Sequence, residues 1–432
     1  MQERQVYHAG GWYHQSLAGM RVLVLNCGSQ SVRLQVIETS PEMAAANADR
    51  VLAKGSVDRL GSAQAALRLE VAERPAVRRA AEAADHRGAL ELAFALLAES
   101  GLRVSEIEAV GHRVVHGGER FVRSTRLDAE VEAEIEACAA LAPLHNPPNL
   151  KGYRASRALL PDAPQVAVFD TAFHQTMPAA AYLYGLPYEL YTEQRIRRYG
   201  FHGTAHRYLS YRYAQIQERP ERDCKLITCH LGNGCSVCAI EGGRSMDTSM
   251  GFTPLEGLVM GTRGGDLDPG VVLHLLGTGA FRADELPALL NERSGLRGLS
   301  GLSNDMRDLL EAAAAGNARA ETAIEVFCHR VRRYVGAYMA LLNGADALIF
   351  SAGIGENAPA VRARICRNLD ALGIRLDEQK NLACRGEEAD LSGGGRTRVW
   401  VIPAHEELML ARETVACLLA GSGPPSESGW HS

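Results

Sequence analysis

Two segments of the chain share one local pattern: a strand, a tight turn rich in Gly, Asn and Ser, and a second strand. The first is VLVLNCGSQSVRLQVIE at residues 22–38, and the second is LITCHLGNGCSVCAIEGG at residues 226–243. Such a repeat predicts two duplicated domains, each presenting one tight turn to a shared cleft. The length of 432 residues exceeds what one hydrophobic core usually supports, which also favours two domains. Two unrelated hairpins remain the alternative.

Strand-like runs alternate with helical stretches along the chain. Residues 165–169 (QVAVF) and 347–350 (ALIF) are typical of buried strands. In residues 321–342 the apolar side chains recur at steps of three or four, at Ile324, Phe327, Val331, Val335 and Tyr338. A last helix is expected to begin near Glu406 and to pack back on a domain. This alternation predicts a layered α/β protein.

Neither end of the chain is expected to carry function. Residues 1–19 show neither helical nor strand periodicity, so they are expected to be a disordered extension, with Met20 as an alternative start of translation. Residues 421–432 have the Gly, Pro and Ser content of a flexible tail.

Charge and hydropathy argue against several partners. The formal net charge is −5 and no basic block occurs, so neither nucleic acid nor an anionic membrane is an expected partner. No apolar run is long enough to span a membrane, and no secretory signal core is present at the N-terminus. The expected location is the cytoplasm.

Four cysteines lie close together at Cys224, Cys229, Cys235 and Cys238. They occupy strand-like sequence whose side chains alternate between faces, and the loop that a zinc ribbon needs is absent. Buried small hydrophobic residues are the favoured interpretation, and a zinc site is the alternative.

The two turns carry groups suited to phosphate oxygens. Asn26, Gly28, Ser29 and Ser31 offer an amide, hydroxyls and accessible backbone N–H groups, and residues 230–234 (HLGNG) offer a second such surface. No Walker loop occurs in the sequence. Each turn alone is a weak signal, because glycine-rich turns are common.

Eight further segments are richer in polar groups than a core requires. They are GHRVVHGGERF (111–121), LAPLHNPPN (141–149), VFDTAFHQTMP (168–178), RRYGFHGTAH (197–206), GFTPLEGLVMGTRGGDLDPG (251–270), SNDMRD (303–308), SAGIGENAP (351–359) and IPAHEELMLARET (402–414). With these motifs, in this order, the sequence from about Met20 to Thr414 resembles the acetate kinase family of the acetate-and-sugar-kinase/actin superfamily.

This resemblance implies a duplicated actin-like (ribonuclease H-like) fold with a nucleotide cleft, and a homodimer. Domain I would comprise residues 20–170 with 405–420, and domain II residues 171–404. The implied reaction is reversible, direct in-line transfer of a phosphoryl group from ATP to acetate, giving ADP and acetyl phosphate. Mg²⁺ would be the metal, with Mn²⁺ as a possible substitute.

The resemblance also implies roles for individual residues. The catalytic residues would be Arg113, Asp170, His202 and Arg263. Arg113, Val115, Leu144, Phe201 and Pro254 would bind the acyl substrate. Asn26 and Glu406 would be associated with Mg²⁺. The nucleotide would contact Ser29, Ser31, Arg33, His230, Leu231, Gly232, Asn233, Gly234, Asp305, Met306, Arg307, Gly353, Ile354, Gly355, Glu356 and Asn357.

The chemistry explains why these residue types occur together. Phosphoryl transfer concentrates negative charge on the equatorial oxygens, so positioned cations supply most of the catalysis. Arg113 and Arg263 can donate forked hydrogen bonds and remain charged at any working pH. A carboxylate nucleophile is already ionised near pH 7, so Asp170 is expected to orient an arginine or the Mg²⁺ shell rather than to act as a base.

Two positions depart from the family pattern. Gln30 interrupts a run of three serines, and His405 replaces an asparagine before Glu406. The second departure leaves the geometry of the Mg²⁺ shell open and suggests sensitivity to mildly acidic pH. Propionate kinase is the nearest alternative activity, butyrate kinase and a pyrophosphate-using kinase are more distant, and a nucleotide-binding scaffold without turnover is the non-enzyme alternative.

Overall fold

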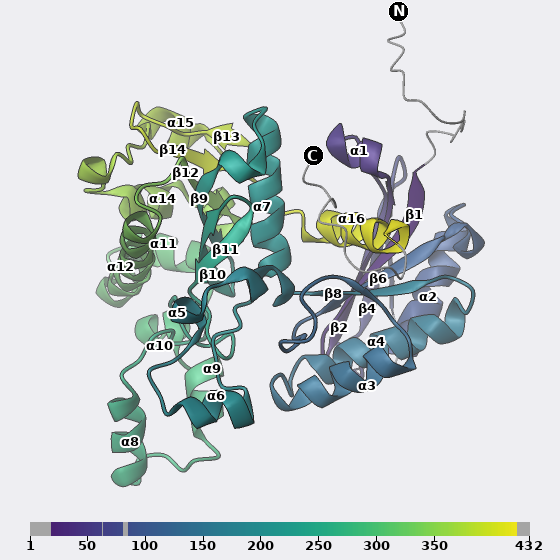
Figure 1. Ribbon diagram of the computed structural model, residues 1–432, viewed down its shortest axis with the longest axis horizontal. Helices are drawn as coiled ribbons and strands as arrows, with labels where there is room; N and C mark the ends of the chain where they lie inside the picture. The colour runs from purple at the N-terminus through teal and green to yellow at the C-terminus, as the bar shows by residue number, and fades with distance from the viewer. Residues whose placement is uncertain (1–18, 63, 81–84, 421–432) are drawn as a thin grey trace, which may run out of the picture.

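The computed structural model describes residues 19–62, 64–80 and 85–420 as two α/β bodies, each built on one mixed β-sheet (Figure 1). The expectations for residues 1–18 and for the tail at 421–432 lie outside the described residues. We refer to the sheets as sheet A and sheet B, and to each sheet with its covering helices as a body. The division into domains at residues 170/171 and 404/405 stays a prediction.

Sheet A has eight strands in the order β5-β4-β3-β2-β1-β6-β8-β7. Its strands are β1 (Met20–Cys27), β2 (Ser31–Thr39), β3 (Arg50–Asp58), β4 (Ala66–Val71), β5 (Val77–Ala80), β6 (Ala109–Val114), β7 (Thr125–Arg126) and β8 (Gln165–Phe169). Strands β1, β2 and β3 form an antiparallel meander, and β1, β6 and β8 run parallel.

Sheet B has six strands in the order β11-β10-β9-β12-β14-β13. Its strands are β9 (Lys225–Leu231), β10 (Cys235–Glu241), β11 (Arg244–Thr248), β12 (Ala347–Ser351), β13 (Ala389–Asp390) and β14 (Arg398–Val401). Strands β9, β10 and β11 form an antiparallel meander, as β1, β2 and β3 do in sheet A. Strands β9, β12 and β14 run parallel, and β13 pairs antiparallel with β14 at the edge. The strand order of sheet B therefore matches β3-β2-β1-β6-β8-β7, which confirms the predicted duplication.

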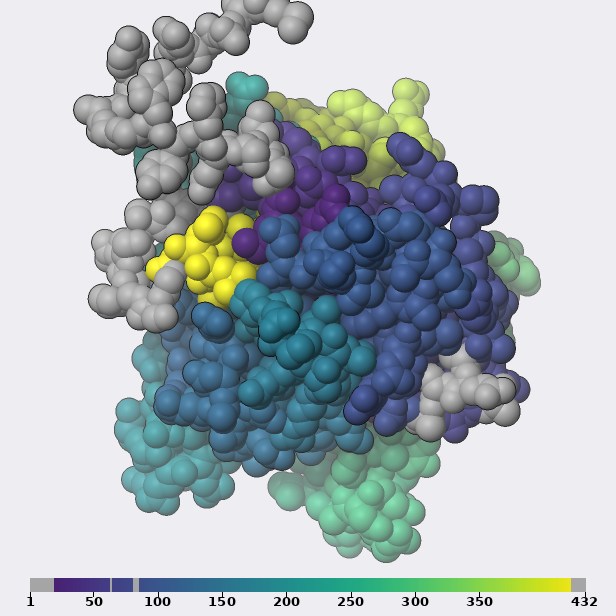
Figure 2. Space-filling view, turned by 90° about the vertical axis from the view of Figure 1, so that its right-hand side faces the viewer, coloured from purple at the N-terminus to yellow at the C-terminus, as the bar shows by residue number. Residues whose placement is uncertain are grey.

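Helices cover both faces of each sheet. On sheet A, α2 (His86–Glu99) and α4 (Asn146–Leu159) pack on one face and α16 (Glu406–Leu419) packs on the other. Figure 2 shows the sheet A body, with α16 in yellow at its margin. On sheet B, α12 (Ala318–Leu341) covers one face and α7 (Gly203–Ile216) the other. Because α7 contacts α16, these two helices join the bodies (Figure 1).

Shorter helices complete the structure. They are α1 (Pro41–Ala45), α3 (Ala129–Ala137), α5 (Ala179–Tyr182), α6 (Tyr188–Gln194), α8 (Pro269–Gly277), α9 (Leu286–Glu292), α10 (Gly295–Ser300), α11 (Met306–Ala314), α13 (Ala352–Asn357), α14 (Pro359–Cys366) and α15 (Glu378–Ala383). Among the described residues, no helix is both long and apolar enough to cross a membrane.

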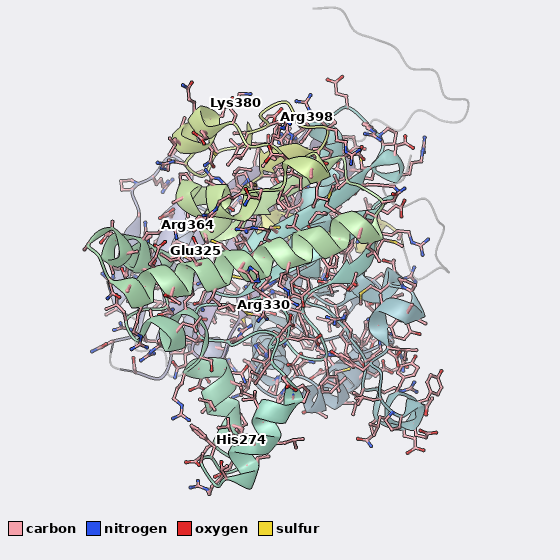
Figure 3. The ribbon with its side chains drawn as sticks, turned by 90° about the vertical axis from the view of Figure 1, so that its left-hand side faces the viewer. His274, Glu325, Arg330, Arg364, Lys380 and Arg398 are labelled. Carbon is pink, nitrogen blue, oxygen red and sulfur yellow. The ribbon has the colours of Figure 1, made fainter. Side chains whose placement is uncertain are left out.

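The long helix α12 confirms the periodicity argument. All five predicted face residues are buried in the core over sheet B. The helix begins earlier than predicted because the Asn317 side chain caps it by accepting a hydrogen bond from the backbone N–H of Ala320 at 3.0 Å. Figure 3 shows α12 running across the body, with Glu325 on the side that faces Arg364. The Nη1 of Arg364 lies 3.2 Å from Oε1 of Glu325.

The four clustered cysteines do not converge. Cys229 and Cys235 pack in the core that contains α12, whereas Cys224 and Cys238 pack in the core that contains α7, on the opposite face of sheet B. All four are free and buried. Burial raises the pKa of the Cys235 thiol to about 12, so it stays protonated and behaves as a small hydrophobic group.

Candidate active site at the carboxyl ends of both sheets

The predicted site residues gather where parallel strands end. In sheet A, Asn26 lies near the end of β1, Arg113 near the end of β6, and Asp170 directly after β8. In sheet B, His230 lies near the end of β9, and Gly353 follows β12. Parallel strands place their carboxyl ends at one edge, where α/β sheets commonly bind ligands. Residues far apart in sequence are brought together for this reason.

Arg113 and Asp170 form a buried pair. The Nε of Arg113 donates to both carboxylate oxygens of Asp170 at 3.1 Å, and its Nη2 donates to Oδ2 at 2.6 Å. Asp170 is only 1% exposed. Burial alone would lower the pKa of Arg113, but the carboxylates of Asp170 and Glu406 more than offset it and raise that pKa. The second amino group, Nη1, lies 3.4 Å from Oδ1 of Asn26, so the guanidinium is held between β1 and β8.

Arg263 and His202 face the same small space beside Gly234. An atom at the position of a Cβ on Gly234 would lie 3.5 Å from His202 Nε2 and 3.7 Å from Arg263 Nη1. No carboxylate in the described part of the chain pairs with Arg263, whose Nη1 donates to the backbone carbonyl of Pro254 at 3.1 Å. Burial lowers the pKa of Arg263, yet it remains a cation. An anion beside Gly234 would therefore meet an unneutralised guanidinium.

The backbone at His202 is unusual for a residue with a side chain. His202 adopts a left-handed conformation with φ 58° and is the N-cap of α7. Such conformations are strained and commonly occur at functional sites. The next residue must be glycine, because a Cβ on Gly203 would lie 2.2 Å from the carbonyl oxygen of Asp170. The Gly203 N–H donates to that oxygen at 2.9 Å, which ties the start of α7 to the end of β8.

His202 is electrically neutral. Burial and the nearby His230, Arg113 and Arg263 hold its pKa well below the usual range. The rings of His202 and His230 lie 4.6 Å apart between centroids, and burial also lowers the pKa of His230, to about 4. His202 can therefore act as a neutral hydrogen-bond donor.

The oxygen donors near Arg113 fit a Mg²⁺ ion. Asn26, Asp170 and Glu406 supply an amide oxygen and two carboxylates, which are hard ligands. Within the described residues, no group of three His, Cys, Asp or Glu side chains could enclose a metal. An incomplete protein shell suits Mg²⁺, which usually keeps several waters and binds substrate phosphates. Burial raises the pKa of Glu406 to about 7, and a bound cation would favour its ionised form.

The predicted nucleotide residues lie mainly around sheet B. Glu356 belongs to α13 and accepts a hydrogen bond from the Ala404 N–H at 3.0 Å, and the exposed Asn233 accepts one from Asn304 at 3.1 Å. Leu231 and Met306 are buried in the core over sheet B, so only their backbone groups could contact a nucleotide. Of the other predicted nucleotide residues, Ser29 lies in the turn between β1 and β2, and Gly232 lies in the turn between β9 and β10. Ser31 and Arg33 lie on β2, Asp305 caps α11, on which Arg307 lies, and α13 carries Ile354, Gly355 and Asn357.

The predicted acyl pocket is only partly assembled. Val115 and Phe201 are buried at 6% and 2% exposure, and both belong to the core cluster that also contains Met260. Pro254 contributes the carbonyl that binds Arg263. Leu144, in contrast, is 72% exposed, so the structure does not bring it into the pocket. Its role stays a prediction that would require the loop before α4 to approach sheet B.

Comparisons with known proteins agree with this arrangement. The Acetokinase family matches residues 21–412. The chain belongs to the acetokinase family. The acetate kinase of Natranaerobius thermophilus is 52% identical over 404 residues, which cover 92% of this chain and all of that protein.

Solved acetokinase-family structures also match closely. The acetate kinase of Porphyromonas gingivalis has a TM-score of 0.86 at 42% identity, covering 92% of this chain and 100% of that one. A propionate kinase from Francisella tularensis has a TM-score of 0.85 at 41% identity, covering 91% and 99%. The predicted actin-like fold of this acetokinase-family chain is thereby confirmed.

Two supporting residues were missed by sequence reasoning. The buried Asn149 of α4 donates to the carbonyl of Cys27 at 2.8 Å and accepts from the Val115 N–H at 3.1 Å, linking the ends of β1 and β6. Arg362, which is fully buried, donates to the carbonyls of Gly355 at 2.9 Å and Glu356 at 2.7 Å and so supports the SAGIGEN segment. The Asn149 contacts join segments that only the fold brings together. Arg362 lies seven and six residues after its two partners, but its residue type alone does not distinguish it from a surface arginine.

A third missed residue, Ser236 of β10, connects two histidines. Its Oγ lies 2.9 Å from His202 Nδ1 and 2.7 Å from His206 Nε2. Ser236 has a single hydroxyl proton, so it can donate to only one of them. If it donates to His202, that ring carries its proton on Nε2 and presents a donor to the space beside Gly234. His206 Nε2 then donates to Ser236, and Nδ1 accepts from Thr228 at 2.7 Å.

Ser236→Ala should lower kcat by roughly 10-fold, the lower end expected for losing a group that orients a functional histidine. The matched control is Ser245→Ala, which removes another buried serine contact to a histidine, at 2.8 Å from His174 Nδ1. Steady-state kinetics and melting temperature should be measured for both. Equal losses of kcat in the two variants would contradict a specific role for Ser236.

Proposed function

We propose that this chain catalyses the reversible, Mg²⁺-dependent transfer of the γ-phosphoryl group of ATP to acetate. The observation that carries the proposal is that Arg263 and His202 converge beside Gly234, while Arg113, paired with Asp170, lies near enough for its charge to lower the pKa of His202. These groups form a cationic, partly buried space. It is bordered by the turns at residues 26–31 and 230–234, which carry groups suited to phosphate oxygens. Membership in the acetokinase family supports the same activity. We also propose the cytoplasm as its location.

Each proposed catalytic residue has a distinct task. The buried Asp170 fixes the plane of the Arg113 guanidinium, so that Arg113 can orient the acyl carboxylate without losing entropy at each turnover. Arg263 and the Nε2–H of His202 donate hydrogen bonds to the oxygens of the phosphoryl group and stabilise the negative charge on them in the transition state. The attacking carboxylate is ionised at neutral pH, so no side chain needs to remove a proton from it.

Nucleotide and metal would bind across both bodies. We assign the phosphates to the turns at 26–31 and 230–234, and the nucleoside to the segments at 303–308 and 351–359. Asn26, Asp170 and Glu406 would hold Mg²⁺ directly or through water, where it would neutralise charge on the phosphates.

The deciding experiment measures kcat/KM for acetate, propionate and butyrate with Mg·ATP, with hydroxylamine trapping of the acyl phosphate and pyrophosphate as an alternative donor. Acetate ahead of propionate is the expected order. The reverse order would favour propionate kinase, a candidate supported by the structural likeness to the Francisella protein. One methylene in an apolar pocket changes binding by only about 1–3 kcal/mol. If no acyl phosphate formed with any donor, the protein would be a nucleotide-binding scaffold without turnover.

Phe201→Ala should change the ranking of these acids, because removing the ring enlarges the space beside Val115 and favours longer chains. We expect the ratio of kcat/KM for butyrate over acetate to rise by roughly 10-fold or more. Phe94→Ala, which removes a buried ring from the sheet A core, is the control for destabilisation. An unchanged ranking in Phe201→Ala would remove Phe201 from the pocket.

We further propose that the protein is a homodimer in which α8 contacts the second copy. This helix projects from the sheet B body (Figures 1 and 3) and exposes Val271, Leu273 and Leu276 at 42%, 69% and 38%. Contiguous exposed apolar side chains commonly mark interaction surfaces.

Leu273→Asp should weaken dimerisation by roughly 30-fold or more, the effect of losing about 2 kcal/mol at a central apolar contact. Sedimentation velocity across a concentration series would measure this change. Leu419→Asp, at an exposed apolar position on α16, should leave association unchanged. A parent protein that is monomeric at all concentrations would contradict the proposed dimer.

A further inference from the structure

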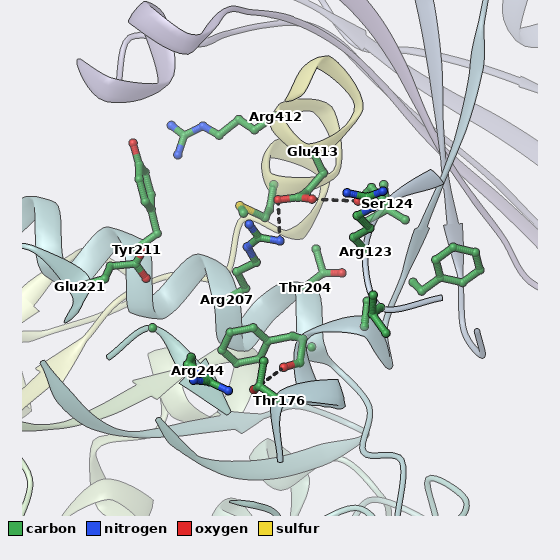
Figure 4. A pocket seen from close by; sticks show the side chains of 18 residues that line it. Arg123, Ser124, Thr176, Thr204, Arg207, Tyr211, Glu221, Arg244, Arg412 and Glu413 are labelled. Carbon is green, nitrogen blue, oxygen red and sulfur yellow. Dashed lines mark hydrogen bonds and ion pairs between the residues drawn. The ribbon is translucent and has the colours of Figure 1, made fainter. Parts of the chain in front are cut away.

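A cavity of about 190 Å³ lies between the two bodies, away from the proposed catalytic side chains. The sheet A body contributes Arg123, Ser124, Phe169 and the α16 residues Met409, Arg412 and Glu413. The sheet B body contributes Phe173, Thr176, Thr204, Arg207, Tyr211, Glu221 and Arg244. Figure 4 shows Thr204 and Arg207 of α7 between the side chains of α16 and those near β11. Arg113, Asp170, His202, Arg263 and Glu406 do not line it.

Positive charge predominates around this cavity, because four arginines and two glutamates line it. Arg412 is neutralised by Asp49 at 2.5 Å, and Arg207 pairs with Glu413 at 2.9 Å. Glu413 also accepts a hydrogen bond from Ser124 at 2.8 Å. The second glutamate of the lining, Glu221, accepts a hydrogen bond from Ser210 at 2.7 Å. The other two arginines form no ion pair with a carboxylate of the described residues.

Those two are Arg123 and Arg244, both exposed. No carboxylate in the described ranges lies within ion-pair distance of either. Apolar side chains such as Val122, Phe173 and Met409 form other parts of the wall. A cavity with an apolar wall and two available guanidinium groups suits an organic anion.

The size of the cavity limits its occupant. A cavity of about 190 Å³ is somewhat larger than a cavity of about 150 Å³ that holds benzene. A short dicarboxylate is a molecule of this size. A dicarboxylate also offers one carboxylate to each arginine, as forked recognition by guanidinium requires.

We propose that this cavity is a regulatory site for a small dianionic metabolite of the dicarboxylate type, held by Arg123 and Arg244. The two arginines come from different bodies: Arg123 precedes β7 in sheet A, and Arg244 begins β11 in sheet B. An anion bound to both links the bodies and favours one angle between them. Binding does not depend on the proposed function, whereas the effect on turnover rests on it.

Two residues of the cavity wall are also sequence neighbours of proposed catalytic residues. Its wall includes Phe169 and Gly203, which directly precede Asp170 and directly follow His202. The Arg207–Glu413 pair connects α7 to α16, and α16 begins at Glu406. A ligand that alters this contact would change how the proposed catalytic residues of sheet A face those of sheet B. A contact between two bodies that has two arrangements can couple a regulatory site to a catalytic one.

Calorimetric titration with succinate tests the binding site in the parent, in Arg123→Ser/Arg244→Ser, and in the charge-matched control Lys54→Ser/Arg333→Ser. All four substituted residues are exposed, so their replacement should not unfold the protein. We expect one succinate site in the parent and the control, and at least 10-fold weaker binding in the Arg123/Arg244 variant. Equal affinity in all three proteins, or no binding to the parent, would overturn the site.

The regulatory role has its own measurement. At saturating substrates, succinate should change kcat of the parent and the control by at least 2-fold and leave the Arg123/Arg244 variant unchanged. Competition with acetate alone, equal in all proteins, would place succinate in the active site instead. Binding at the arginines without any change in kcat would overturn regulation. A protein that makes no acyl phosphate but binds succinate as described would refute the proposed activity and not this site.

Discussion

Arg263→Ala is expected to lower kcat by about 10³-fold, with a smaller change in the KM for ATP. The physical reason is the position of its guanidinium beside Gly234 without a carboxylate partner among the described residues. A cation in this position stabilises charge that develops only in the transition state, and the loss of such a group costs roughly 10³-fold or more. Initial-rate kinetics at saturating acetate and varied Mg·ATP would separate the two effects.

The control for this variant is Arg297→Ala, an exposed arginine of the neighbouring α10. It should retain the parent kcat, because it removes the same charge without reaching Gly234. Arg263→Lys should recover only part of the activity, since an ammonium cannot reproduce the planar fork. A near-normal kcat for Arg263→Ala would refute the assigned role.

Asp170→Asn is expected to lower kcat/KM for acetate by roughly 10³-fold. Removing one charge of a buried pair costs about 3–5 kcal/mol, and here the loss releases Arg113 from its orientation. The substitution also removes a hard anionic ligand. The Mg²⁺ concentration needed for half-maximal activity should therefore rise. Activity titrations with Mg²⁺, together with acetate kinetics, would measure both effects.

Asp49→Asn is the matched control, because Asp49 forms the other buried pair described above, with Arg412 at 2.5 Å. Both side chains of that pair are 3% exposed. This variant should lose thermal stability and keep its Mg²⁺ requirement. If the two aspartate variants lowered the melting temperature alike and neither changed kcat, Asp170 would be structural.

Much of the fold could be predicted because its signals are local. The apolar spacing from Ile324 to Tyr338 identified the buried face of α12, and the alternation of the cysteines correctly placed them on opposite faces of sheet B. The two glycine-rich turns indicated a duplication that the matching strand orders confirm. Each of these features depends on residues a few positions apart, so the sequence displays them directly.

The residues of the candidate site could be predicted from the sequence for a different reason. Resemblance of whole motifs identified Arg113, Asp170, His202 and Arg263, whereas their residue types alone would suit an ordinary surface. Ser236, Asn149 and Arg362 had no such signal, since a buried polar side chain looks the same in sequence whether it supports a core or a catalyst.

By itself, the sequence determined the layered α/β class, the duplicated hairpins and the family. Only the tertiary structure decided that Ser236 lies between His202 and His206, that Leu144 is exposed, and that Arg123 and Arg244 border one cavity. Secondary structure follows from neighbours along the chain, but these contacts depend on how two sheets and the helices between them are placed in space, which no local spacing encodes.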